Sequence, residues 1–282
     1  MKQVKLILGT AGYCYAKEHH AIKGGRKKEI PFNAVFALIK HPEKGWVLFD
    51  TGYTERFHEV TSTFPGSIYA KITKVCIKPE EEVKAQLLAR NINPKSIEHI
   101  IVSHFHADHV GGLKDFPNAT FYCSKPAYNQ VHKLRGLRAV AKGLLTNLLP
   151  EDFSERTLFF EDIGQKIEGD FFQKSYDLFG DESILVHSIP GHAAGQYAAE
   201  IKTNKGHYFL AADSAWLKKS YQEYALPNPI VKLFFDSWAD FKDSLKRLQN
   251  YHLANPETII IPTHCNETCN PLIQLSKDED GL

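Results

Sequence analysis

The run of ten residues 103–112 limits what this chain can fold into more than any other feature. It reads SHFHADHVGG and follows the apolar stretch Ile100 to Val102, which is typical of a strand buried on both faces. The glycines that end the run let the backbone fold tightly around a small group. Four of its side chains are of types that bind metal ions, namely His104, His106, Asp108 and His109. The run therefore predicts a metal site at the end of a buried strand.

One loop does not complete the coordination of two metal ions, so further ligands are expected at the ends of other strands. Three candidates follow predicted strands: His192 comes after 184–189, Asp213 after 207–212, and His264 after 258–261. Each is weak alone, because a histidine or aspartate after a strand is more often an ordinary loop residue. Their recurrence after successive strands favours one shared site.

The remaining pattern predicts an α/β chain. Short β-rich runs occur at 4–8, 34–40, 46–49, 98–103, 119–123, 184–189, 197–202, 207–212 and 258–261, with the turn 41–45 closing a hairpin. A helix is expected over 80–90, with an apolar stripe of Val83, Leu87 and Leu88. Strand clusters that alternate with helices favour two sheets packed face to face with helices outside, in a single domain of residues 1–282.

A second helix is expected after Ser237, whose hydroxyl is placed to cap it. Its predicted buried stripe consists of Phe241, Leu245, Leu248 and Leu253. Two aromatic and basic segments, 53–77 and 125–172, are expected to cover the site as a cap or lid. Within the second segment, 125–142 is expected to form an amphipathic cap helix whose cations could also steer a carboxylate or phosphate substrate.

Composition excludes several classes of protein. The chain has 282 residues with 34 basic and 33 acidic side chains, so its charge gives no overall bias toward nucleic acid or anionic membranes. No apolar run approaches the roughly 20 residues that span a bilayer. Five scattered cysteines favour free thiols over a disulfide framework, which fits a reducing compartment. We therefore expect a cytoplasmic protein that acts on a small molecule and has no nucleic-acid or membrane partner, and self-association stays open.

The chain resembles the metallo-β-lactamase superfamily from the hairpin before Asp50 to His264. The HxHxDH string is the diagnostic motif of that family, and residues 50–52 match its DTG loop. The resemblance implies a four-layer αββα sandwich and two divalent metal ions, with zinc expected and Mn²⁺ or Fe²⁺ as alternatives. It implies that His104, His106 and His192 hold one ion, that Asp108, His109 and His264 hold the other, and that Asp213 bridges the two. Asp50 would support the site.

Two such ions lower the pKa of a shared water toward about 7 and polarise a substrate oxygen. The resemblance therefore implies a hydrolase, in which Asp108 could pass a proton to the leaving group and Asp213 would complete the catalytic centre. The histidine at 106 disfavours the diiron redox relatives, which carry glutamate there. The bridging Asp213 disfavours true zinc β-lactamases. A short C-terminal end leaves no room for the substrate domain of glyoxalase II.

The pattern is most similar to the acyl-homoserine lactonase-like branch, which favours a lactone, ester or thioester substrate. Those lactonases carry a tyrosine three residues after the bridging aspartate, whereas this chain has Trp216, an indole that donates a hydrogen bond but is no acid. Tyr221 and Tyr224 could replace that phenol, line an apolar pocket or belong to the core. Two alternative functions stay open: hydrolysis of a small phosphodiester, and metal binding without catalysis.

Overall fold

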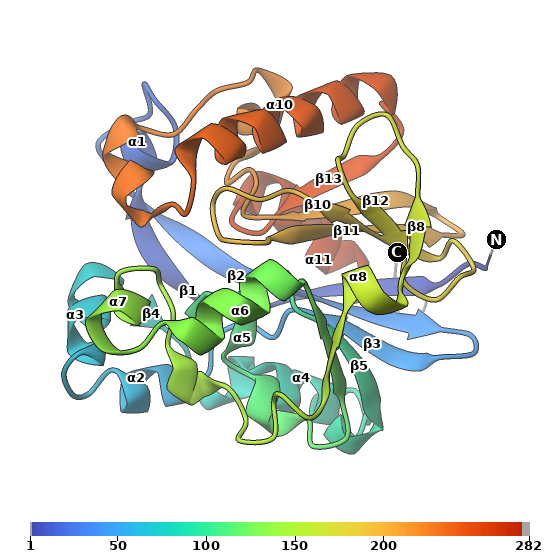
Figure 1. Cartoon of the computed structure of the whole chain (residues 1–282), viewed down its shortest axis with the longest axis horizontal. Coiled ribbons are helices and arrows are strands. Elements are labelled where there is room, and N and C mark those ends of the chain that lie inside the picture. Colours follow the sequence, from blue (N-terminus) through green and yellow to red (C-terminus); the bar gives the residue numbers. More distant parts are fainter. Residues whose placement is uncertain (1, 278–282) are drawn as a thin grey trace.

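The structure is a computed structural model that describes residues 2–277, and it contains two packed β-sheets with helices on both outer sides (Figure 1). The first sheet has seven strands in the order β4 (Val75–Cys76), β1 (Lys5–Lys17), β2 (Glu29–His41), β3 (Gly45–Phe49), β5 (Ile97–Ile101), β6 (Thr120–Cys123) and β7 (Thr157–Phe159). The second has six in the order β13 (Ile259–Pro262), β12 (Gly206–Ala212), β11 (Tyr197–Thr203), β10 (Ile184–Ser188), β9 (Ser175–Asp177) and β8 (Gln165–Ile167).

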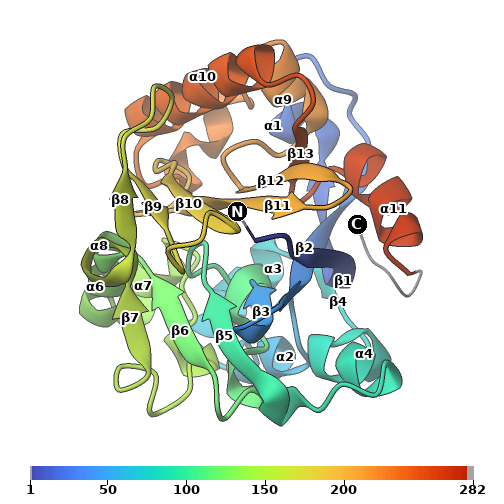
Figure 2. The same cartoon turned by 90° about the vertical axis from the view of Figure 1, so that its right-hand side faces the viewer.

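Helices cover the outer faces of both sheets (Figure 2). The six-stranded sheet is covered by α10 (Trp238–Ala254) and α9 (Lys218–Gln222), with the 3-10 helix η5 (Pro229–Phe234) between them in the chain. Helices α2 (Arg56–Val60) and α4 (Val83–Ala89) lie outside the seven-stranded sheet, and α11 (Asn266–Leu275) packs against β1, β2 and β13. The expected αββα sandwich is confirmed. Among the helices of the described residues, none has the length and apolarity needed to cross a bilayer.

Three apolar cores hold the layers together. The central one joins the facing sides of the sheets, with Val47 and Ile101 from one sheet and Val186 and Leu210 from the other. A second core lies between the seven-stranded sheet and its helices, and a third lies between the six-stranded sheet and α10. The later parts of β5 and β12 are therefore buried on both faces, which explains why residues 100–101 and 208–212 are continuously apolar.

The directions of the strands bring several chain segments to one end of the sandwich. Strands β3 and β5 are parallel, as are β12 and β13, and β10 has the direction of β12 because both are antiparallel to β11. The amide of Tyr197 donates to the carbonyl of Ser103 at 3.0 Å, so the two sheets are joined directly beyond the end of β5. Residues that follow these strands therefore meet at this end.

Several sequence-based expectations need correction. Residues 80–90 form the 3-10 helix η1 (Pro79–Glu81) and then α4, and Leu88 is exposed although Val83 and Leu87 are buried. Ser237 caps α10 as expected and accepts a hydrogen bond from the amide of Asp240 at 3.2 Å. Leu253 of the predicted stripe is exposed, because it lies two residues after the buried Tyr251 and therefore on another face of α10.

The two segments expected to cover the site have mixed structures. Strand β4 of the first segment pairs with β1, and strands β7 and β8 of the second segment belong to the two sheets. Residues 125–142 form two helices, α6 (Lys125–Lys133) and α7 (Gly136–Val140), in place of the single expected helix. The backbone is extended at Leu134 and Arg135 and left-handed at Gly136, which ends α6. Helix α3 (Gly66–Ile72) of the first segment packs against α7.

Replacing Leu245 by alanine tests the third core. This side chain is fully buried in α10, so we expect the free energy of unfolding to fall by 2–5 kcal/mol, measured by denaturant titration. The matched control is Leu253→Ala in the same helix, where the side chain is 68% exposed and a change within about 0.5 kcal/mol is expected. Equal losses in the two variants would contradict this assignment of the buried face.

Candidate metal centre

The structure brings all seven predicted ligands to one end of the sandwich. Their potential ligand atoms fall into three overlapping groups, within each of which the atoms lie within 4.8 Å of one another. The groups are His104, His106 and His192; His104, His109 and Asp213; and Asp108, His109 and His264. The side chains come from the loop after β5, from α5 (Ala107–Val110), and from the residues that follow β10, β12 and β13. Segments up to 160 residues apart thus share one site.

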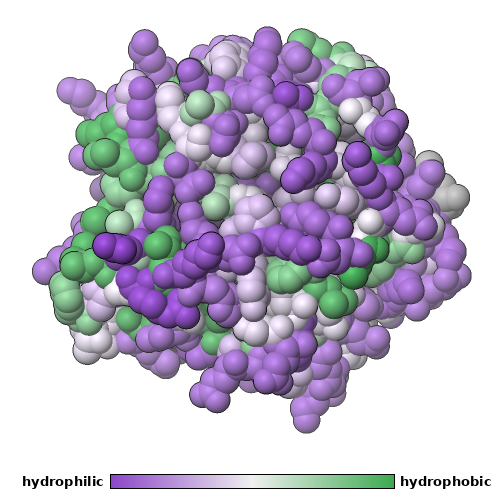
Figure 3. Space-filling view, viewed as in Figure 1, coloured by the Kyte–Doolittle hydropathy of each residue, from purple (hydrophilic) through white to green (hydrophobic). Residues whose placement is uncertain are grey.

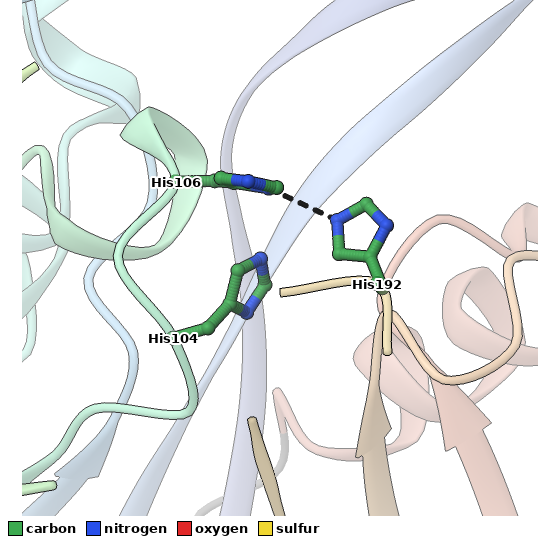
Figure 4. Close-up of side chains that lie close together, drawn as sticks. All are labelled: His104, His106 and His192. Carbon is green, nitrogen blue, oxygen red and sulfur yellow. Dashed lines mark hydrogen bonds between the residues drawn. The ribbon is translucent and has the colours of Figure 1, made fainter. Parts of the chain in front are cut away.

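The first group is held by one imidazole contact and one backbone contact. Nδ1 of His106 lies 2.9 Å from Nε2 of His192, and the ring of His104 lies beside both (Figure 4). Nε2 of His106 lies 3.1 Å from the carbonyl of Lys142, so this nitrogen carries the proton that it donates. Nδ1 of His106 is consequently left with a lone pair directed toward the group.

His264 in the third group is oriented in the same way. Its Nδ1 lies 2.9 Å from the carbonyl of Asn33, which leaves Nε2 to face Oδ2 of Asp213 at 3.1 Å. The ring of Phe32 stacks on the imidazole with centroids 4.6 Å apart and an interplanar angle of 14°. Nε2 of His264 is also 3.6 Å from Oδ2 of Asp108. A backbone carbonyl and an aromatic ring therefore fix the tautomer and the plane of this ligand.

Asp213 lies between the two outer groups. Its Oδ1 is 3.4 Å from Nε2 of His109, and its Oδ2 is 3.2 Å from Nε2 of His192. The residue follows β12, where the backbone of Ala212 has the unusual φ of +45°. This carboxylate is thus in contact with imidazoles on both sides, which is the position expected for a bridging ligand.

Asp50 is not one of the seven candidate ligands, but it contacts one of them, His109. Its Oδ2 lies 2.7 Å from Nδ1 of His109, and its two oxygens accept hydrogen bonds from the amide and the hydroxyl of Ser103 at 2.8 and 2.7 Å. The aspartate is fully buried after β3 and has a left-handed φ of +58°. It holds His109 so that Nε2 points toward Asp213, as an outer carboxylate orients a metal-binding histidine.

Orphaned polar atoms show that a cation fits this site. Nε2 of His104, Nε2 of His109 and Oδ1 of Asp213 are buried and have no hydrogen-bond partner. Burial without a hydrogen bond is costly for each of these atoms, and two metal ions, one on the side of His104 and one on the side of His109 with Asp213 between them, would satisfy all three. Imidazole nitrogens and carboxylate oxygens are a donor set suited to zinc, with Mn²⁺ and Fe²⁺ as alternatives for the oxygen-richer half.

Three of these groups, His104, His192 and Asp108, have the protonation that metal binding requires. Burial lowers the pKa of His104 well below its usual value and that of His192 to about 3, so both imidazoles are neutral near pH 7. Burial opposes ionisation of Asp108, but the neighbouring His109 and His264 hold its pKa at about 2. Neutral imidazoles and ionised carboxylates are the forms that coordinate metals. Despite burial, the Asp108 carboxylate raises the pKa of His109 well above its usual value and the Asp213 carboxylate raises the pKa of His264, so a metal ion would replace a proton on each of these two imidazoles.

Several residues of the site were not found from the sequence. These are Ser103, the carbonyls of Asn33 and Lys142, and the ring of Phe32. A backbone carbonyl leaves no trace in the sequence, and a lone phenylalanine in a strand is indistinguishable from a core residue. Only the serine, which directly precedes the histidine string, carried a local signal.

The aromatic residues left open by the sequence are now placed. Trp216 donates from its indole Nε1 to Oδ2 of Asp213 at 3.2 Å. Tyr221 is buried in the third core against His252, and the hydroxyl of Tyr224 donates to the carbonyl of Lys242. Neither tyrosine occupies the position of a phenol at the site. Burial and then the Asp108 carboxylate raise the pKa of Tyr69 in α3 well above its usual value, so this phenol stays protonated near the centre.

Comparison with known proteins agrees with this geometry. Residues 31–264 match the family model of the Metallo-beta-lactamase superfamily. The N-acyl homoserine lactonase AttM of Azorhizobium caulinodans is 27% identical over 257 residues, which cover 88% of this chain and 89% of that protein. The structure of an N-acyl homoserine lactone hydrolase with N-hexanoyl-L-homoserine bound superposes with a TM-score of 0.72 at 20% identity, covering 95% of each chain. AidC, a dizinc quorum-quenching lactonase, has a TM-score of 0.62 at 15% identity and covers 94% of this chain and 89% of its own.

Replacing Asp50 by asparagine tests the support of His109. Asparagine tolerates the left-handed backbone but carries no charge, so we expect metal affinity to fall by about 10–100-fold, measured by competition with a chelator. Asp181→Asn is the matched control, because Asp181 also lies 2.9 Å from a histidine, His41, outside the centre. Metal affinity should be unchanged in this control, and equal losses in both variants would contradict the role of Asp50.

Proposed function

Because the chain belongs to the metallo-beta-lactamase superfamily, we propose that it is a dinuclear metal hydrolase that opens a lactone of a small, partly apolar molecule. Esters and thioesters of similar size are included in the proposed substrate class. The observation that carries the proposal is the set of buried, partnerless atoms of His104, His109 and Asp213 among seven converging ligands. A protein that used this fold only as a scaffold would have no need to keep such a costly group complete.

The proposed chemistry divides between the ions and the chain. Two divalent ions in this site would supply a hydroxide near neutral pH and stabilise the negative charge that develops on the substrate oxygen. His104, His106 and His192 would hold one ion, and Asp108, His109 and His264 the other, with Asp213 between them. Asp108 is an ionised carboxylate near pH 7, so we assign to it the transfer of a proton in two steps: it would accept the proton that the attacking water releases and then donate it to the leaving alkoxide.

An aromatic wall beside the centre supports a partly apolar substrate. The ring of Phe235 lies 5.0 Å from that of His192 and 5.3 Å from that of Trp216. Phe32 joins Trp216 to His264. Small-molecule sites typically combine such apolar walls with a few polar groups that orient the reacting part. The lactonases that resemble this chain, in sequence or in fold, support the same substrate class.

Phosphodiester hydrolysis is the second candidate, and one observation favours it. Residues 133–142 carry four cations and no acidic residue, and Lys142 contacts His106 through its carbonyl. The positive charge of these side chains beside the site would attract an anionic phosphodiester. A direct comparison of substrates separates the two candidates.

We expect the purified protein to contain two equivalents of metal and to hydrolyse lactones faster than thioester and phosphodiester probes. Elemental analysis gives the metal content, and titration of the released acid gives the rates for N-acyl homoserine lactones of several chain lengths. His106→Ala should lose one ion and most of the turnover. Metal content near zero, or bis-(p-nitrophenyl) phosphate turning over faster than every lactone, would overturn the proposal.

Trp216→Phe tests how the bridging carboxylate is oriented. The substitution keeps an aromatic ring but removes the donor to Asp213, and a hydrogen bond to a charged group is worth about 1.5–3 kcal/mol. We expect kcat to fall by about 10–100-fold with the ring packing retained. Trp238→Phe is the control, because Trp238 packs against Phe235 and Phe241 instead of the ligands. Wild-type turnover in Trp216→Phe would exclude this role.

A further inference from the structure

Exposed apolar side chains are concentrated beside the metal centre. The described part of the chain exposes fourteen large apolar side chains, and half of them lie on three short segments, 64–74, 133–142 and 226–235. We call these segments the rim; their exposed apolar residues are Phe64, Ile68, Ile72, Leu137, Ile230, Leu233 and Phe234. Figure 3 shows the corresponding hydrophobic patches over α3 and α7 and over the segment that precedes α10. Scattered apolar residues are ordinary on a surface, but a cluster of this kind marks a site of interaction.

The rim is one surface and borders the site. Helices α3 and α7 are in contact, and Nζ of Lys142 donates to the carbonyl of Phe235 at 3.2 Å, which joins the second segment to the third. The carbonyl of Lys142 contacts His106, and the ring of Phe235 contacts that of His192. The exposed apolar groups are therefore arranged around the end of the centre formed by these two histidines.

The charge of the rim is strongly positive although that of the whole chain is near zero. Its three segments contain seven cations and no aspartate or glutamate, whereas the chain has 34 basic and 33 acidic residues. The cations are Lys71, Lys74, Lys133, Arg135, Arg138, Lys142 and Lys232. Of these, only Lys142 forms an ion pair within residues 2–277, with Asp236 at 3.5 Å. The basic loop 22–28 adjoins the rim, since the amide of Lys23 donates to the carbonyl of Leu226.

We propose that the rim docks on an anionic lipid surface, with its apolar side chains in the interface and its cations at the headgroups. Interleaved apolar and basic residues bind such surfaces by burying apolar area and by attracting anionic lipids. A second copy of the chain fits less well, because a symmetric contact would set these cations against one another. A bound substrate alone does not account for the rim either, since Leu233 is 81% exposed to solvent.

Docking of this kind needs no spanning helix, and it departs from the expectation, drawn from the sequence, that the chain has no membrane partner. That expectation rested on total charge and on the absence of a long apolar run, and neither quantity detects a local surface. Docked by its rim, the protein would hold the entrance to the centre at the interface, where partly apolar molecules accumulate. The proposal does not depend on the reaction catalysed, because binding to lipid is measured without turnover.

Sedimentation with vesicles tests the proposal on the full chain. We expect the protein to bind vesicles of equal parts phosphatidylcholine and phosphatidylglycerol, and to bind pure phosphatidylcholine at least tenfold more weakly. Binding should weaken with added salt, because screening shortens the reach of the charges. The absence of binding to the anionic vesicles would overturn the proposal.

Two triple variants with matched controls locate the contact. Charge reversal at three rim cations, each worth about 1 kcal/mol near an anionic surface, should lower binding by at least about a hundredfold. The variant carries Lys71→Glu, Arg138→Glu and Lys232→Glu; its control carries Lys95→Glu, Lys166→Glu and Lys277→Glu, which are exposed outside the rim. The apolar variant carries Ile72→Ser, Leu137→Ser and Leu233→Ser; its control carries Leu88→Ser, Leu253→Ser and Leu275→Ser, which are similarly exposed.

Only one pattern of results supports the rim. Both rim variants must lose vesicle binding while both controls keep it, with circular dichroism showing that all four remain folded. Equal loss in a rim variant and its control would overturn the assignment of this surface. So would a wild-type protein that self-associates in analytical ultracentrifugation through the rim and ignores vesicles, because the occupant would then be a second copy of the chain.

Discussion

Buried negative charge is the constraint on which the site depends. The carboxylates of Asp50, Asp108 and Asp213 are buried beside five imidazoles, and an uncompensated carboxylate there costs several kcal/mol. Protonated histidines do not balance them all, because crowding by neighbouring imidazoles and burial keep the pKa values of His104 and His192 low. Divalent cations bound by these ligands would resolve this imbalance.

The loop after β3, which carries Asp50, packs closely against the histidine-rich loop after β5. The amide of Thr51 donates to the carbonyl of His109 at 2.8 Å, and the hydroxyl of Thr54 donates to the carbonyl of Gly111 at 3.0 Å. A side chain at Gly111 would place its Cβ 2.5 Å from the carbonyl oxygen of Gly52, so this position requires glycine. Gly111 thus allows the loop that contains Gly52 to lie close to the histidine loop, in addition to allowing the tight turn expected from the sequence.

Residues around the seven candidate ligands also shape the chemistry of this centre. The indole of Trp216 donates to Asp213, the proposed bridging ligand, whereas a phenol at this position could act on substrate. Helices α3 and α7 are in contact, and the carbonyl of Lys142, two residues after α7, contacts His106; both helices leave apolar and cationic side chains exposed. A hydrolase with this rim would meet a lipophilic substrate at a surface, and the same local charge would concentrate anionic molecules near the entrance.

The sequence by itself determined the fold class and the identity of the seven candidate ligands, because the periodicity of strands and the spacing of a metal motif are local properties. It also determined the cap of α10, a contact over three residues. Tertiary structure alone decided that Leu88 and Leu253 are exposed, that residues 125–142 form two helices, and that the carbonyls of Asn33 and Lys142 orient ligands. The rim likewise is formed only by the tertiary structure, since its three segments are distant in the chain and their positive charge is cancelled in the net charge of the whole chain. Contacts between segments that are distant in the chain leave no periodic pattern in the sequence. They are decided by how the secondary-structure elements pack.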